Sequence, residues 1–351
     1  MTDAYARAGV DTGEATDALS GLIGVLRTID PGRPSRSVVH PGHYASVLEV
    51  GPNLGIALCT DGVGTKVIVA EQARRFDTVG IDCVAMNVND LICVGAEPLA
   101  LVDYLAVEQA DPAVLRQLAV GLKAGAEAAG VEIPGGELAQ LPELIRGHPP
   151  PFGFDLLAAA IGTVALDALV TGRACTPGDA IVGLPSSGLH SNGYTLARRA
   201  LLEDGALGLD DRPDELGGAT VADALLEPTT IYVRGALDLL RGDVPVHGLA
   251  HITGDGVRNL LRLSDAVSFE LDAPLPVPPI FELIAERGGI AADEMWQVFN
   301  MGCGFCCVVP ADRAAEAAER LGRFHPGAAV IGRVGEGPTR VSLPTLGLRF
   351  A

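Results

Sequence analysis

The chain has 351 residues, of which 48% are hydrophobic and 20% are charged, a balance typical of a folded globular protein and not of a disordered one. Its formal net charge is −19, and a surface this acidic repels nucleic-acid phosphates, which argues against a nucleic-acid partner. The charge does not exclude a phosphorylated small substrate, because backbone N–H groups, Lys and His can reverse the field inside one pocket.

Neither the N-terminal sequence nor the apolar runs indicate export or membrane insertion. Met1–Arg7 has no apolar stretch of signal-peptide length, and the longest uncharged apolar run, Leu156–Leu166, is too short to cross a bilayer. The seven cysteines are an odd number scattered through apolar segments, as is typical of reduced thiols. We therefore expect a cytoplasmic protein with no membrane contact.

Taken in chain order, the first half alternates helical and strand patterns. Helical spacing over 14–29 is followed by a Pro/Gly/Arg/Ser-rich loop over 30–42. Apolar strands are predicted at 55–60, 99–106 and 156–164, and helices in the C-terminal part of 78–94 and over 112–129.

The second half repeats this alternation. Strands are predicted at 180–184, 305–309 and 329–334, and helices at 194–202 and 311–321. Thr171–Asp179 is the best candidate linker, and we place the domains at 1–167 and 168–351. Helices layered on sheets in both halves predict a two-domain α/β (α+β) fold.

The first chemically informative motif, Asp61-Gly-Val-Gly-Thr-Lys66, directly follows a predicted strand. Gly62 and Gly64 allow a ligand to approach the backbone closely, Asp61 supplies a hard oxygen, and Lys66 supplies a positive charge. The motif lacks the Gly-Lys-Ser/Thr ending of a Walker A loop. A tight turn with an exposed Lys is the alternative.

Two further motifs supply acidic or amide side chains. Asn87-Val-Asn-Asp90 lies in an otherwise apolar stretch, where buried polar groups are costly unless they bind something; a helix-capping cluster is the alternative. Gly135-Gly-Glu137 adds another acid beside flexible backbone. Because Mg²⁺ prefers oxygen ligands and nucleotide phosphates, the three motifs together predict an ATP–Mg²⁺ site.

A polar loop, Gly188-Leu-His-Ser-Asn-Gly193, stands where a predicted strand turns into a helix. Free N–H groups at a helix start, joined by Ser, Asn and His side chains, are typical of an anion-binding loop. Cys303-Gly-Phe-Cys306 is a single CxxC pair that runs into a strand, so we interpret it as core thiols and not as a zinc site.

The motifs, taken in order, resemble those of the aminoimidazole ribonucleotide synthetase family. The matching segments are DGVGTK (61–66), GIDCVAMNVNDL (80–91), GAEPL (95–99), GGE (135–137), GLHSNGY (188–194), EPT (227–229), HITGDG (251–256) and FNMGCG (299–304). They span nearly the whole chain, and the GLHSNGY, EPT and HITG set points to the ring-closing branch of a superfamily that also contains small-molecule kinases.

The resemblance implies ATP-dependent closure of an imidazole ring in purine synthesis, in a homodimer whose N-terminal sheets form a barrel-like interface. It implies catalytic roles for Lys66, His190 and His251, and metal ligation by Asp61, Asp90 and Glu137. The resemblance also implies which residues contact the two substrates. ATP would contact Asp61, Gly62, Gly64, Thr65, Lys66, Asn89, Asp90, Gly136 and Glu137, and the ribonucleotide would contact Gly188, His190, Ser191, Asn192, Gly193, Thr229 and His251.

Three segments depart from the family pattern. Pro41-Gly-His-Tyr-Ala45 replaces a Gly-Gly-Phe-Gly-type loop, Leu138-Ala-Gln140 replaces Thr-Ala-Glu after the GGE motif, and Asp255 replaces the middle Gly of HITGGG. The alternatives are therefore a kinase of the same superfamily or a relative that closes a different ring. A catalytically silent scaffold is the rival outside enzymes, but it has no need of the retained Asp61, Lys66, Asp90, Glu137 and His190.

Overall fold

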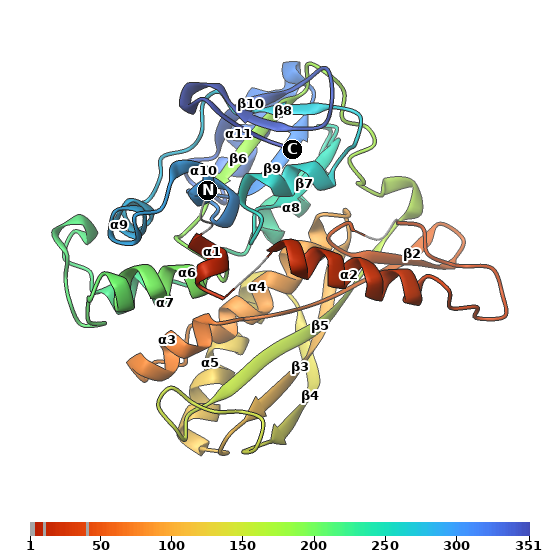
Figure 1. The fold of residues 1–351 in the computed structure, drawn as a ribbon. Helices are drawn as coiled ribbons and strands as arrows, with labels where there is room; N and C mark the ends of the chain where they lie inside the picture. Colours follow the sequence, from red (N-terminus) through yellow and green to blue (C-terminus); the bar gives the residue numbers. More distant parts are fainter. Residues whose placement is uncertain (1–3, 10–11, 40–41) are drawn as a thin grey trace.

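The computed structural model describes residues 4–9, 12–39 and 42–351, which form two β-sheets with helices packed on them (Figure 1). One sheet is built from residues 46–164 and the other from residues 180–350. The predicted domain boundary at 167/168 falls in the segment that connects the two sheets. We call the parts on either side of that segment the N-terminal half and the C-terminal half.

The N-terminal sheet has five strands in the order β1-β2-β5-β3-β4. Their bounds are β1 Ser46–Gly51, β2 Leu54–Gly62, β3 Glu97–Val107, β4 Glu132–Gln140 and β5 Phe154–Val164. Neighbouring strands are antiparallel except β3 and β4, which are parallel. On β5 the buried positions alternate strictly with more exposed ones, so one face of the sheet is an apolar core and the other faces outward.

Helices α4 (Val79–Ile92) and α5 (Pro112–Ala129) cover the inner face of this sheet and pack on each other. The side chain of Asp111 caps α5 by accepting the N–H groups of Ala113 and Val114, and Gly130 ends the helix in the left-handed conformation. The two helices approach closely because glycines meet at their crossing. A Cβ on Gly80 would stand 2.3 Å from the backbone nitrogen of Leu122.

The C-terminal sheet has seven strands in the order β12-β11-β8-β10-β6-β9-β7. Their bounds are β6 Ala180–Pro185, β7 Gly248–His251, β8 Ser268–Glu270, β9 Cys303–Val309, β10 Ala329–Gly335, β11 Val341–Leu343 and β12 Leu348–Phe350. All neighbours are antiparallel except β8 and β11. Strand β9, which pairs with β6 and β7, is buried at all seven positions, and its three cysteines are core residues as predicted.

The remaining helices surround this framework. They are α1 Ala4–Arg7, α2 Thr12–Leu26, α3 Lys66–Ala73, α6 Tyr194–Arg198, α7 Val221–Leu226, α8 Val233–Leu240, α9 Pro279–Gly288, α10 Ala292–Val298 and α11 Ala314–Gly322. A π-helical segment, Arg199–Asp204, continues α6. Although α1 opens the chain, it lies on the C-terminal half, where the backbone N–H of Tyr5 donates to Glu294 Oε1 at 2.7 Å.

Two local expectations are corrected by the structure. Strand β2 continues through Asp61 and Gly62, because both residues pair with β5 at Ala158 and Leu157, so the acid stands on the strand and not in a loop after it. The GGE motif, expected beside flexible backbone, lies inside β4 because it pairs with Val102, Asp103 and Tyr104 of β3. Within the described residues, no helix is both long enough and apolar enough to span a bilayer.

Candidate active site

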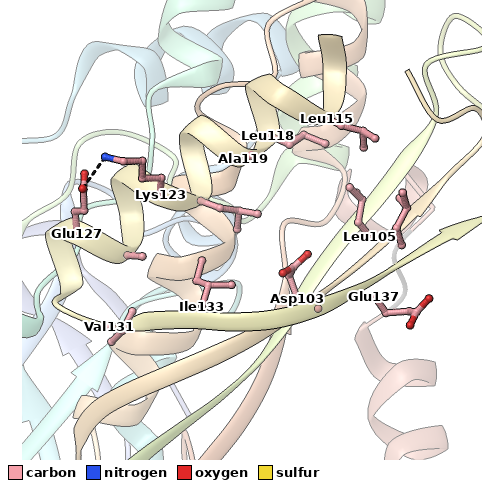
Figure 2. Close-up of a pocket in the computed structure, with 14 residues that line it drawn as sticks. Asp103, Leu105, Leu115, Leu118, Ala119, Lys123, Glu127, Val131, Ile133 and Glu137 are labelled. Atoms are coloured by element: carbon pink, nitrogen blue, oxygen red, sulfur yellow. Dashed lines mark hydrogen bonds and ion pairs between the residues drawn. The ribbon is translucent and has the colours of Figure 1, made fainter. Parts of the chain in front are cut away.

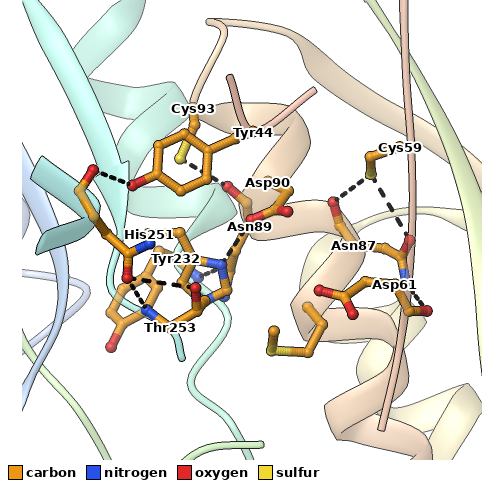
Figure 3. A network of polar contacts seen from close by, with 12 residues as sticks. Tyr44, Cys59, Asp61, Asn87, Asn89, Asp90, Cys93, Tyr232, His251 and Thr253 are labelled. Carbon is orange, nitrogen blue, oxygen red and sulfur yellow. Dashed lines mark hydrogen bonds and ion pairs between the residues drawn. The ribbon is translucent and has the colours of Figure 1, made fainter. Parts of the chain in front are cut away.

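The site lies where the N-terminal half meets the C-terminal half, around the end of β2 and the C-terminal part of α4 (Figure 3). The side-chain amide of Asn87 on α4 donates to the backbone oxygen of Asp61 at 3.1 Å, which ties the helix to the strand. Asp90, one turn further along α4, is close enough for its negative charge to act on the Asp61 carboxyl. The structure therefore brings together two of the three predicted metal ligands.

Asp61 resists ionisation. Burial, together with the negative charge of Asp90, raises the pKa of Asp61 to about 6, while the N–H of Gly62, which donates to Asp61 Oδ1 at 2.7 Å, opposes the shift. Two carboxylates held near each other in a partly buried site are stabilised when a cation lies between them. Hard oxygen ligands of this kind match Mg²⁺.

Asp90 is oriented from the C-terminal half. Nδ1 of His251, at the end of β7, lies 2.9 Å from Asp90 Oδ1, and its Nε2 faces the amide nitrogen of Asn89 at 3.4 Å. The Asn89 amide is itself fixed, since its nitrogen donates to the carbonyl of Thr230 and its oxygen accepts the N–H of Tyr232. An amide nitrogen can only donate, so Nε2 is the acceptor and the proton on Nδ1 is donated to Asp90. His251 is fully buried and acts on Asp90 in this arrangement.

The loop 188–193 lies directly on the DGVGTK segment. Ser191 Oγ donates to the carbonyl of Val63 at 2.7 Å, and the hydroxyls of Thr65 and Thr195 are 3.2 Å apart. Gly193 precedes α6 at φ +74°, where a Cβ would stand 2.3 Å from the ring of Phe299. The predicted nucleotide and ribonucleotide segments are therefore neighbours across the junction.

Lys66, the predicted phosphate-binding cation, has no exposed surface. Its Nζ lies 2.7 Å from Asp82 Oδ2 and donates to the carbonyls of His190 at 3.0 Å and Glu227 at 2.7 Å. Asp82 Oδ1 accepts both the N–H of Thr229, at 2.8 Å, and its hydroxyl, at 2.6 Å. In this arrangement Lys66 and Thr229 are both bound to Asp82. Contact of either residue with a ligand would therefore require these contacts to open.

His190 is almost completely buried and holds a left-handed backbone conformation, with φ +63°. Its Nε2 accepts the N–H of Ser187 at 3.2 Å and faces that of Thr230 at 3.5 Å. Burial lowers the pKa of His190 well below its usual range, aided by the nearby His251 and Lys66. The ring is therefore neutral with its proton on Nδ1, a buried donor that has no partner among the described residues.

Gly136 and Glu137 lie elsewhere in the subunit. The row Asp61–Ala158–Asp103–Gly136 crosses β2, β5, β3 and β4, so Gly136 stands three strands from Asp61, about 14 Å at the usual strand spacing. Glu137 pairs with Tyr104 on the opposite, outward face. The predicted grouping of Glu137 with Asp61 and Asp90 therefore does not form within a single copy of the chain.

A cavity of about 610 Å³ separates α5 from β3 and β4 (Figure 2). Its walls are mainly apolar, with Asp103 directed toward α5 and the Lys123–Glu127 ion pair at one end. Gly136 and Glu137, on β4, border this cavity, whereas Asp61 and Asp90 do not. Across the described ranges, no three His, Cys, Asp or Glu side chains form a ready-made metal centre.

Several groups that build the site were not predicted from the sequence. Asp82 stands inside an apolar helical run with no local sign of its pairing with Lys66. Asn259 Oδ1 accepts the N–H of Thr253 at 2.7 Å, and its backbone oxygen accepts the hydroxyl of Tyr44 at 2.9 Å. The Tyr44 contact joins the segment before β1 to the C-terminal half; of the departing segment, residues 42–45 lie among the described residues and Pro41 does not.

Asp255, which departs from the family pattern, lies at the surface. Its Oδ2 accepts a hydrogen bond from Arg262 at 3.2 Å, and both side chains are more than a third exposed. The Arg262 guanidinium also lies over the ring of Tyr44, 5.1 Å from its centre. The substitution therefore adds a local surface ion pair without replacing any of the buried groups described above.

Comparison with known proteins gives a consistent result across the chain. Residues 42–164 match the N-terminal domain of AIR synthase related protein, and residues 176–343 match its C-terminal domain. A phosphoribosylformylglycinamidine cyclo-ligase of Thermococcus gammatolerans is 48% identical, covering 95% of this chain and 96% of that protein. One of Methanothermobacter thermautotrophicus is 47% identical, covering 97% and 96%.

Solved structures with the same fold are more distant in sequence. "AaThiL complexed with AMPPCP and TMP" has a TM-score of 0.60 at 19% identity, covering 86% of this chain and 87% of that one. "T. maritima PurL complexed with FGAR" has a TM-score of 0.59 at 18% identity, covering 90% of this chain and 48% of that one. The fold is thus shared more widely than the sequence. Because both halves of this chain match the family's two domains, and because its cyclo-ligase relatives match it over nearly their full length, this chain belongs to the AIR synthase family.

Proposed function

We propose that the chain is an ATP-dependent phosphoribosylformylglycinamidine cyclo-ligase of de novo purine biosynthesis. The observation that carries the proposal is the 48% and 47% identity to cyclo-ligases over almost the whole of both chains. The arrangement of Asp61, Asp90 and the 188–193 loop at one junction supports it, because a nucleotide and a ribonucleotide must meet in one place.

In the proposed reaction the γ-phosphoryl group of ATP passes to the formyl oxygen of formylglycinamidine ribonucleotide, and ADP leaves. The neighbouring amidine nitrogen then attacks the activated carbon, phosphate departs with the former formyl oxygen, and the imidazole ring closes. The substrates supply every bond that forms or breaks. The protein therefore contributes chiefly by positioning the reactants and neutralising charge.

Asp61 and Asp90 fit a divalent cation, since both supply hard carboxylate oxygens and a cation would offset the repulsion that Asp90 exerts on the Asp61 carboxylate. Bound Mg²⁺ would neutralise the charge of the nucleotide phosphates. The chain holds both carboxylates in place, Asp90 through His251 and Asp61 through the N–H of Gly62, while Asn87 fixes the backbone of Asp61. Gly62, Gly64 and Thr65 border Asp61 and would face the phosphates, while Asn89 fixes His251.

The ribonucleotide is assigned to the loop 188–193 and its neighbours. Asn192 lies between the sulfur of Met86, 3.8 Å from its amide nitrogen, and Gly254, where a Cβ would stand 3.3 Å from its amide oxygen. The unpartnered Nδ1–H of His190 is a neutral donor beside the same loop. These groups suit the oxygens of a ribose phosphate, which accept hydrogen bonds.

A homodimer through the N-terminal sheets is supported by the outward face of that sheet. Register places a set of half-exposed apolar side chains on this face, namely Leu48, Leu58, Val102, Tyr104 and Ile161, each 36–47% exposed. A contiguous apolar face of this kind is typical of a protein–protein interface. Glu137 lies on the same face, so it would reach a nucleotide site only across that interface.

The test is to incubate the purified protein with ATP, Mg²⁺ and formylglycinamidine ribonucleotide and to identify the products by mass spectrometry. The proposal predicts ADP, phosphate and aminoimidazole ribonucleotide in equal amounts. A stable phosphorylated ribonucleotide without ring closure would instead identify a small-molecule kinase of the same fold.

A further inference from the structure

The junction between the halves contains a fully buried ion pair whose two members both come from the N-terminal half. Lys66 is the first residue of α3 and Asp82 lies in the first turn of α4, and neither side chain has any exposed surface. Removing two charges from water costs several kcal/mol for each ion, and only close geometry and further hydrogen bonds offset that cost. A pair retained in such a place needs a reason beyond stability.

Every remaining hydrogen bond of the pair goes to the C-terminal half. Lys66 Nζ donates to the carbonyls of His190 and Glu227, and Asp82 Oδ1 accepts the backbone N–H and the hydroxyl of Thr229. The ammonium thus has one carboxylate and two carbonyls within 3.0 Å. The pair therefore contacts two separate loops, 188–193 and 227–230, at once.

Those two loops also contact each other. The N–H of Thr230 faces Nε2 of His190 at 3.5 Å, and Ser187, the residue before the first loop, donates its hydroxyl to the carbonyl of Pro228 at 2.6 Å and its N–H to the ring of His190. His190 has φ +63°, a conformation that costs free energy for a residue with a side chain and persists only where its surroundings impose it. Lys66 imposes it from one side by holding the carbonyl of the same residue.

We propose that Lys66 and Asp82 are positioning residues that hold the 188–193 and 227–230 loops in the arrangement that binds the ribonucleotide. This inference rests on the proposed function, and it gives Lys66 a different role from a direct phosphate contact. The pair touches no substrate. It fixes the backbone of His190 and Thr229, and through them the position of the Nδ1 donor and of Ser191 and Asn192.

The test uses Lys66→Met, Asp82→Asn, the double variant, and Arg323→Met as a control that removes an exposed ion pair with Glu319. Each single variant leaves one buried group without its partner. We expect KM for the ribonucleotide to rise about 10- to 100-fold in each, as for loss of a hydrogen bond to a charged group. The dissociation constant of a nonhydrolysable ATP analogue should change less than about threefold, and the control should match the wild type in both.

The double variant separates positioning from direct contact. The double variant leaves no buried charge unpaired. The fold increase in its KM for the ribonucleotide should therefore be smaller, by about tenfold or more, than the product of the fold increases of the two single variants. If Lys66 instead binds phosphate directly, Lys66→Met abolishes analogue binding, Asp82→Asn does not, and the double variant shows no recovery. That result would overturn the inference.

Amide hydrogen exchange gives a readout that does not depend on turnover. Asp82→Asn and Lys66→Met should speed exchange in 186–193 and 227–231 and leave β9 unchanged. The pair would be merely structural if exchange in both loops stayed unchanged, or if thermal stability fell while KM for the ribonucleotide stayed unaltered. If the wild type fails to close the ring while the loops still loosen as described, the proposed function is wrong and the positioning role stands.

Discussion

At the scale of single residues, Asp61 is the group whose chemistry is most sensitive to its surroundings. Burial and the charge of Asp90 raise its pKa to about 6, whereas a free aspartate titrates near pH 3.9. Well below pH 4 the carboxyl is protonated in the folded and the unfolded chain alike. As the pH rises to about 6, the unfolded chain releases its proton first, so the folded state loses stability over this window.

Replacing Asp61 with Asn should therefore stabilise the protein without nucleotide at pH 8 and change it little at pH 4. A shift of about two units corresponds to at most about 3 kcal/mol. The amide oxygen can still accept the N–H of Gly62, so the local fold is retained. Calorimetry at both pH values measures the effect, and an equal gain at pH 4 and pH 8 would contradict the assigned ionisation.

Asp90→Ala should lower turnover by about a thousandfold or more, because it removes the carboxylate that His251 orients and that a cation needs. Steady-state kinetics with circular dichroism checks the prediction. Asp272→Ala removes a half-exposed acid that pairs with Arg333 at the surface, and it serves as the control. Near-normal turnover of the Asp90 variant would remove Asp90 from the site.

The sequence was informative at this scale wherever function depends on residues close together along the chain. The proximity of Asp61 to the Asn87–Asp90 segment follows from a helix packing on the strand before it. The position of Glu137 could not be predicted, because register alone decides which face of β4 it occupies. The pairing of Lys66 with Asp82 could not be predicted either, because it depends on how the N-terminal ends of α3 and α4 pack against the C-terminal half.

At the scale of elements, α4 is the helix on which the site depends, since it carries Asp82, Asn87, Asn89 and Asp90. Its contact with α5 depends on Gly80, where a Cβ would lie 2.3 Å from a backbone nitrogen and 2.6 Å from a backbone carbonyl carbon of α5. Backbone atoms cannot turn aside as a flexible side chain can. The two helices would therefore have to separate to accept any larger residue.

Gly80→Ala should lower the free energy of unfolding by about 1–3 kcal/mol, the usual cost of overpacking a well-packed core. Gly24→Ala is a matched control, because Gly24 is also helical and a Cβ there meets no atom within 4 Å in the described chain. The control should be neutral or stabilising, since Ala favours a helix more than Gly does. Chemical denaturation measures both, and equal effects would contradict close α4–α5 packing.

The strand and helix order was largely predicted from apolar periodicity and from the Gly and Pro positions. Several predicted elements are confirmed, with no end more than two residues from the prediction. They are the strands at 99–106, 156–164, 180–184 and 305–309 and the helix at 112–129. Strand β4 was not predicted because GGE reads locally as a turn, while its pairing with β3 is a long-range interaction. Strands β7, β8, β11 and β12 have three or four residues each, too few for a periodic signal.

At the scale of the whole molecule, the proposed dimer makes a direct prediction. Val102→Glu places a charge on the outward face of β3 and should convert a dimer into a monomer, because an unpaired charge is costly in a buried interface. Val330→Glu is the control, since Val330 is 42% exposed on β10 of the other sheet. Light scattering coupled to size exclusion measures the mass, and a Val102 variant that stays dimeric would place the interface elsewhere.

The measurement that tests the account most directly follows phosphate release and ring closure together. The purified protein is mixed with ATP, Mg²⁺ and formylglycinamidine ribonucleotide labelled with ¹⁸O at the formyl oxygen. Because that oxygen accepts the phosphoryl group and leaves with it, the proposed mechanism gives one ¹⁸O atom in each phosphate and one aminoimidazole ribonucleotide for each ADP. Unlabelled phosphate, or ADP formed without the imidazole product, would contradict it.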